Sequence, residues 1–138
     1  MSAQGGAPEP VWISRALLDA MHAELVERYG GAHGVISEAL VDSALTRTRP
    51  GNLLSYVPDR DLAALAASLC FGLAKNHGFR DGNKRTALAA AAVFLRLNGQ
   101  RLVVSEPEAV AAMVYLATDV WSEERMAVWF RKHLVSVG

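Results

Sequence analysis

The sequence predicts an all-α fold, a single bundle of about six helices. Apolar residues recur at three- and four-residue steps through most of the chain, which places them on one face of a helix. Several of these segments begin at serine and end at glycine or asparagine, residues that start and stop helices. Only residues 101–104 resemble a strand, and that stretch is too short to form a sheet alone.

Two helices and a loop are expected in the first half of the chain. The first helix starts after Ser14, an N-cap residue, and ends at residues 30–31, a glycine pair that readily adopts the left-handed conformation. A shorter helix is expected over residues 37–46, and the prolines of residues 47–58 indicate a loop. The apolar stripe predicted for the first helix consists of Leu18, Met21, Leu25 and Tyr29.

Four further helices are expected in the second half. Residues 76–82 carry glycine and polar side chains and interrupt the helical pattern. Ser105 and Glu108 form a capping box with a proline in the first turn, which is a strong helix start. The four helices are therefore expected near residues 59–75, 83–97, 105–118 and 122–133.

Composition and charge exclude several classes of protein. At about 100–200 residues per domain, the 138 residues make one domain, with a flexible tail expected over residues 1–13 and a helical domain over 14–138. The 14 basic and 14 acidic side chains cancel, which argues against direct binding to nucleic acid. The uncharged stretch of residues 62–74 is too short for a membrane span. A single cysteine, Cys70, favours a cytoplasmic setting and is expected to be buried.

Residues 77–87 are the one segment whose composition indicates chemistry. They lie at the junction of two expected helices, where the first N–H groups of the second helix have no intrahelical partners and suit a phosphate. Gly82 lets a ligand approach the backbone, while Lys84 and Arg85 place cations where the helix dipole disfavours them. Such a placement indicates an anionic ligand.

An imidazole and a carboxylate accompany this phosphate cradle. His77 can accept a proton near neutral pH, and oxygen atoms of Asp81 and Asn83 are of the kind that Mg²⁺ accepts. A base, a metal ligand and a phosphate cradle together predict phosphoryl or nucleotidyl transfer. His22, His33 and His133 have no partners at such spacing and are expected to be structural.

The segment closely resembles the motif of the Fic/Doc superfamily, H-x-F-x-[D/E]-G-N-G-R-x-x-R. The superfamily's second glycine is Lys84 here and its final arginine is Leu88, and both differences follow the Doc (death-on-curing) branch, whose pattern reads N-K-R-T-A-L. The resemblance covers roughly residues 14–99. The matching motif positions are His77, Phe79, Asp81, Gly82, Asn83 and Arg85.

The resemblance implies a role for each motif residue. His77 would be the general base on a Ser or Thr hydroxyl of a protein target, and Asp81 would hold the Mg²⁺ of a bound ATP. The nucleotide phosphates would be bound by Gly82, Asn83, Lys84 and Arg85. Phe79 would be buried and anchor the loop.

Doc-type toxins transfer the γ-phosphoryl group, whereas Fic-type enzymes usually transfer AMP. Because Lys84 fills space that glycine leaves open, and Leu88 removes an anchoring arginine, the triphosphate is expected to lie differently here, which favours kinase chemistry. The implied substrate is a translation factor similar to elongation factor Tu. The alternatives are a Fic-type AMP or nucleotidyl transferase and, from another class, a non-catalytic helical protein that binds a partner.

Two features of the family bear on partners. A short flap before the catalytic helix docks the target as an added strand, and residues 53–57 have suitable composition for it. Self-inhibited Fic proteins carry a glutamate followed by Gly or Asn, and no glutamate of this sequence has that neighbour. Inhibition is therefore expected from another chain, which for a Doc-like protein implies a Phd-like antitoxin.

Overall fold

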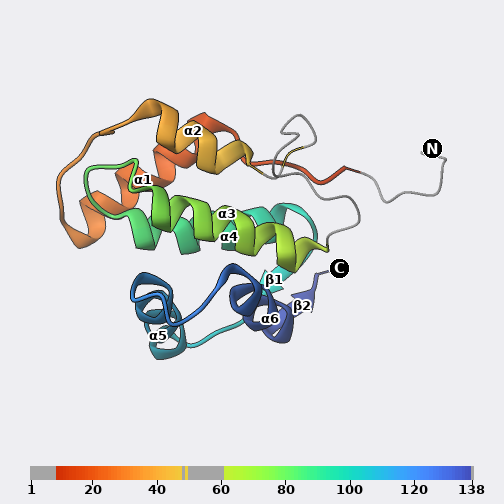
Figure 1. Ribbon diagram of the computed structural model, residues 1–138. Coiled ribbons are helices and arrows are strands. Elements are labelled where there is room, and N and C mark those ends of the chain that lie inside the picture. Colours follow the sequence, from red (N-terminus) through yellow and green to blue (C-terminus); the bar gives the residue numbers. More distant parts are fainter. Residues whose placement is uncertain (1–8, 48, 50–60, 138) are drawn as a thin grey trace.

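The computed structural model describes residues 9–47, 49 and 61–137, and within them it forms three layers of helices (Figure 1). The middle layer is a pair of helices, α3 and α4, with α1 and α2 on one side and α5 and α6 on the other. The expected all-α fold with six helices is confirmed. The helices are α1 (Arg15–Tyr29), α2 (Glu38–Thr46), α3 (Leu62–Asn76), α4 (Asn83–Leu97), α5 (Glu106–Ala117) and α6 (Glu123–His133).

The helix starts are set by side-chain caps that could be read from the sequence. The hydroxyl oxygens of Ser14, Ser37 and Ser122 each accept a hydrogen bond from the backbone N–H three residues later. Ser105 and Glu108 form the expected capping box at the start of α5. The helix α4 differs, because Gly82 precedes it and no side chain caps its N-terminus.

The buried face of α1 differs from the expected stripe. Its buried side chains are those of Leu18, His22 and Val26, whereas Tyr29 is 52% exposed. The packed face therefore lies to one side of the predicted stripe and has a histidine at its centre. A prediction from hydrophobic spacing passes over this face because it counts His22 as polar.

Residues 11–13 are held against α4, although the expected tail extends to residue 13. The backbone N–H of Val11 donates to Asn98 Oδ1 (2.8 Å), and Asn98 Nδ2 donates back to the Val11 carbonyl (2.9 Å). Trp12 stacks on Phe94, and Ile13 is buried in the core. Apolar burial thus fixes the chain before the first helix begins.

A small antiparallel pair joins two short strands, β1 (Gln100–Leu102) and β2 (Leu134–Ser136). Arg101 is the register partner of Val135. The expected strand-like stretch therefore pairs with β2, which follows α6 directly, and no local sequence pattern predicts this pairing. The expected flap falls on residues that lie outside those described.

The core centres on α3, which is apolar around most of its circumference and contacts α2, α4, α5 and α6. Cys70 on this helix is fully buried, as the sequence predicts. No helix among the described residues is long and apolar enough to cross a bilayer.

Burial raises the pKa of the Cys70 thiol to about 12. Because the thiolate is the reactive form, we expect Cys70 in the folded chain to react with a disulfide reagent at pH 8 at least ~100-fold more slowly than in the unfolded chain. Absorbance of the released thiolate, followed with and without denaturant, measures both rates. Equal rates would show that α3 is not closed around this side chain.

Candidate active site

The connection between α3 and α4, residues 77–82, has left-handed backbone at both ends. His77 follows α3 with φ 53° and ψ 43°, and Gly82 precedes α4 with φ 77° and ψ 17°. A glycine adopts this conformation at no steric cost, whereas for a residue with a Cβ, such as histidine, it is uncommon and costs roughly 1–2 kcal/mol. The side chain of His77 is exposed, as is that of Asp81.

The α1–α2 connection lies beside the α3–α4 connection at the same end of the molecule (Figure 1). Val35 forms an isolated antiparallel bridge with Phe79, and the N–H of Arg80 donates to the Gly34 carbonyl (2.9 Å). The Gly78 carbonyl accepts the N–H of Ile36 (2.8 Å). These bonds attach the candidate site to a segment more than forty positions earlier in the sequence.

Gly78 is required by this close approach. A Cβ at that position would lie 2.6 Å from Val41 Cγ2 and 3.0 Å from the Val41 backbone nitrogen. The sequence offered no reason for this glycine. The reason is that the first turn of α2 packs directly on the loop.

Asp81 is fixed at two of its atoms by residues of α1 and the loop that follows it. Its Oδ2 accepts the backbone N–H of Ala32 (2.7 Å), and its carbonyl oxygen lies 2.7 Å from His22 Nε2. A Cβ on Gly31 would lie 3.1 Å from the Asp81 Cβ, so Gly31 allows this approach. One carboxylate edge is therefore occupied, and Oδ1 accepts no hydrogen bond among the described residues.

The side chain of Asn83 closes the loop. Its Oδ1 accepts the N–H of Phe79 (3.0 Å), and its Nδ2 donates to the Phe79 carbonyl (2.9 Å). Phe79 itself is buried at 2% exposure, as the resemblance to the Fic/Doc motif implies. The amide of Asn83 is thus used in holding Phe79, so its contribution to a phosphate site would come mainly from the backbone N–H.

The two cations of the motif are both exposed at the start of α4. The guanidinium of Arg85 lies over the ring of Tyr29, 4.6 Å from its centroid, a cation–π contact at the end of α1. Neither Lys84 nor Arg85 forms an ion pair with an acidic side chain of the described residues. Their charge is therefore available to an anion.

A cavity of about 840 Å³ begins at the first turn of α4. Gly82, Asn83, Lys84 and Arg85 line one end of it, and Leu88 follows on the same helix. Apolar side chains of α5 line much of the rest, among them Val110, Met113 and Val114. The structure therefore brings together the four predicted phosphate-binding residues, while His77 and Asp81 lie outside the lining that the described residues give this cavity.

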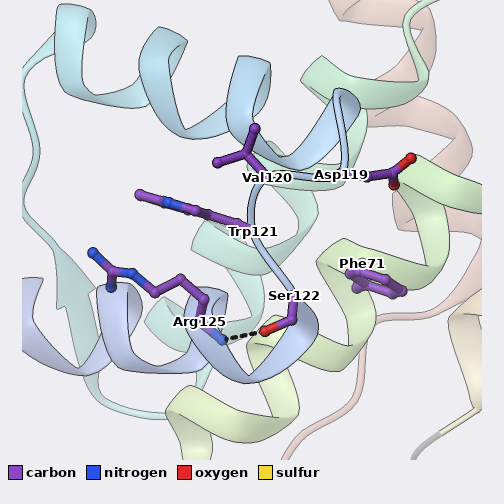
Figure 2. Close-up of a pocket in the computed structure, with 6 residues that line it drawn as sticks. All are labelled: Phe71, Asp119, Val120, Trp121, Ser122 and Arg125. Carbon is purple, nitrogen blue, oxygen red and sulfur yellow. Dashed lines mark hydrogen bonds between the residues drawn. The ribbon is translucent and has the colours of Figure 1, made fainter.

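A second hollow, of about 560 Å³, lies at the turn between α5 and α6 (Figure 2). Trp121 and Arg125 lie on one side of this turn, and Asp119 lies on the other side with Phe71. The guanidinium of Arg125 stacks on the Trp121 ring, 4.6 Å from its centroid. None of the predicted site residues lines this hollow.

The carboxylate of Asp81 fits the kind of ligand that Mg²⁺ uses. Among the described residues, no group of three or more His, Cys, Asp or Glu side chains could hold a metal ion. Mg²⁺ is usually bound by one or two carboxylates together with substrate phosphates and water, so one free carboxylate edge beside the predicted phosphate cradle would meet that requirement. The donor set does not suit a metal bound by protein side chains alone.

Sequence reasoning missed the contribution of α1. His22, expected to be structural, contacts the site loop directly, and Tyr29, expected to be core, lies at the surface against Arg85. No local pattern signals either contact, because His22 is 59 positions from Asp81.

Comparison with known proteins agrees with the motif. Residues 12–95 match the Fic/DOC family. The protein kinase doc of Escherichia phage P1 is 33% identical over 120 residues, which cover 87% of this chain and 93% of that protein. The toxin Doc of Mycolicibacterium smegmatis is 40% identical over 74 residues, 54% of this chain and 56% of that protein. The resemblance predicted from residues 77–88 is thus confirmed, and the chain belongs to the Doc branch of the Fic/DOC family.

Proposed function

We propose that this protein is a Doc-type toxin kinase that transfers the γ-phosphoryl group of Mg-ATP to a Ser or Thr hydroxyl of a translation factor similar to elongation factor Tu. Its similarity to a protein named as a kinase over nearly the whole chain supports this function. The observation that carries the proposal is the uncapped start of α4, where Gly82, Lys84 and Arg85 line a cavity large enough for a nucleotide.

In the proposed reaction, His77 is the general base. Its imidazole would accept the proton of the substrate hydroxyl as the hydroxyl oxygen forms a bond to the γ-phosphorus. The bond between that phosphorus and the β,γ-bridging oxygen would break, and ADP would leave with the electron pair. The exposure of His77 at the end of α3 suits a base that must reach a protein substrate.

The first turn of α4 would hold the phosphates. Its free backbone N–H groups carry the positive end of the helix dipole, and Gly82 allows a close approach. Lys84 and Arg85 would add charge, with Arg85 held in place by Tyr29. Asp81 would hold Mg²⁺ through its free oxygen, and the ion would offset negative charge on the phosphates.

The lining of the cavity favours kinase chemistry over AMP transfer. Leu88 lines it one turn into α4, at the position where the superfamily pattern has an arginine. An apolar side chain there gives a triphosphate no second cationic anchor further along α4, so the only cationic side chains at the phosphates would be those of Lys84 and Arg85 at its first turn. That difference supports an altered pose with the γ-phosphorus toward the hydroxyl.

The proposed function also sets the partners. The relative from Mycolicibacterium smegmatis is named as a toxin, and a toxin of this kind needs an inhibitor within its own cell. We propose a Phd-like antitoxin as that inhibitor. The cytoplasm would be the site of action, because the proposed substrate and ATP are found there.

The mass added to a purified translation factor decides among the candidate reactions. After incubation with the full chain, ATP and Mg²⁺, we expect an increase of about 80 Da on a Ser or Thr, the mass of one phosphoryl group. An increase of about 329 Da would mean AMP transfer instead. No added mass with any nucleotide, from a chain shown to be folded, would favour the non-catalytic binding protein.

A further inference from the structure

The feature that carries a further inference is His22, in the middle of the buried face of α1. Its side chain is 4% exposed, and its ring lies parallel to that of Phe79, with 3.9 Å between centroids and 13° between planes. Its Nε2 lies 2.7 Å from the Asp81 carbonyl oxygen. A Cβ on Gly82 would lie 3.8 Å from the same ring. One imidazole thus contacts Phe79 and Asp81 of the α3–α4 connection and lies beside Gly82.

The partner of this imidazole fixes where its proton lies. A carbonyl oxygen can only accept a hydrogen bond, so Nε2 of His22 must carry the proton and donate it. The Asp81 carbonyl therefore points toward α1. This bond adds to the one from Ala32 to the Asp81 carboxylate, and the two act on different groups of the same residue.

The direction of the Asp81 carbonyl sets the direction of the next N–H. The peptide bond is trans and planar, so the Gly82 N–H points opposite to the Asp81 C=O and hence away from His22. The backbone of Gly82 is in the left-handed conformation, and the residues of α4 that follow it are in the right-handed helical conformation. When successive residues alternate in this way, their N–H groups point toward one place and form an anion-binding concavity called a nest.

Because residue 82 is a glycine, the Asp81–Gly82 peptide plane can rotate to another orientation at little cost. Gly82 can adopt positive or negative φ at little cost, so the backbone alone does not fix the Asp81–Gly82 peptide in one orientation. We propose that His22 is a positioning residue, which holds this peptide so that the N–H groups of Gly82 and the first turn of α4 converge on a phosphate. The identity of that ligand as the polyphosphate of a nucleotide rests on the proposed function.

Two substitutions separate the hydrogen bond from simple packing. His22→Phe keeps a flat ring against Phe79 but has no donor for the Asp81 carbonyl. His22→Gln loses the ring but can place an amide N–H near the position of Nε2. Leu18→Val is the matched control, because Leu18 is fully buried one turn earlier on the same face of α1 and touches none of the loop contacts described.

The experiment is titration of each full-length chain with inorganic tripolyphosphate, followed by calorimetry and by the amide signal of Gly82 in NMR spectra. We expect His22→Phe to weaken binding by about 10- to 100-fold, the usual effect of removing a group that orients a ligand-binding group. The Gly82 amide signal should no longer shift on titration of this chain. His22→Gln should recover most of the affinity, and Leu18→Val should bind as the unsubstituted chain does.

Each other result overturns a specific statement. Equal binding by the His22→Phe and unsubstituted chains, or equal weakening by Leu18→Val, would remove the positioning role while leaving the phosphate site intact. Failure of a folded His22→Gln chain to bind better than His22→Phe would do the same. No binding by the unsubstituted chain would instead overturn the proposed phosphate site itself.

The unsubstituted chain gives a further test if His22→Phe does not fold. The Nε2 proton of His22 should exchange slowly with solvent, and its signal should show coupling to the Asp81 carbonyl carbon. A rapidly exchanging Nε2 proton would overturn the proposal.

Discussion

Replacing His77 with alanine should lower the rate of phosphoryl transfer by ~10²–10⁴, the usual contribution of a general base. At 1.36 kcal/mol for each factor of ten, this loss is roughly 3–5 kcal/mol of transition-state stabilisation. Nucleotide binding should change little, because the four proposed phosphate-binding residues lie at the start of α4 and His77 does not line their cavity. The measurement is the single-turnover rate of ³²P transfer from ATP to the translation factor.

The conformation of His77 requires a second variant beside alanine. Any residue with a Cβ is strained by roughly 1–2 kcal/mol at φ 53°, and histidine occurs in this region more often than alanine does, so His77→Ala should also lower stability. Asparagine tolerates the left-handed region better and cannot act as a base, so His77→Asn should be as inactive as His77→Ala but more stable. His133→Asn on α6, whose Nδ1 lies 2.8 Å from the Trp129 carbonyl, is the control histidine and should keep full activity. An active His77→Asn chain would remove the base assignment.

Local signals explain why so much of the fold could be predicted. A capping hydrogen bond spans three residues, so Ser105 with Glu108 announces the start of α5 whatever surrounds it. The motif at the start of α4 is equally local. The pairing of residues 34–36 with residues 78–80 uses backbone groups alone, which every sequence carries, so it leaves no mark that a single sequence can reveal.

The difference between local signals and tertiary contacts also explains how much of the candidate site could be predicted. The spacing of the motif predicts Gly82 and Asp81 as candidate site residues, but what orients them comes from α1 and the loop after it. His22 looks like an ordinary helix residue until Phe79 and the Asp81 carbonyl are placed against it. The motif therefore predicts which groups do the chemistry, and the tertiary fold decides how each is aimed.

Asn83→Asp should lower phosphoryl transfer at least ~100-fold more than Asn83→Ala does. Both substitutions lose the donor that Asn83 Nδ2 supplies to the Phe79 carbonyl, and alanine also loses the acceptor for the Phe79 N–H. Each broken bond of this kind costs about 1–3 kcal/mol when a buried group is left unpaired, so Asn83→Ala should be the less stable of the two. Asn83→Asp should therefore be the more stable but the less active of the two variants.

The reason is the charge that aspartate would bring to the phosphate cradle. Two negative charges about 4 Å apart repel by about 4 kcal/mol at an effective dielectric constant near 20, which exceeds the benefit of a carboxylate at a helix N-terminus. Because exposed charges are screened by salt, part of the loss should be recovered as ionic strength rises. The measurement is the affinity for ATP and the transfer rate of both chains at low and high salt, below the melting temperature of each. If the Asn83→Asp chain works as well as the Asn83→Ala chain, no phosphate approaches the start of α4, and the cavity there must serve some other ligand.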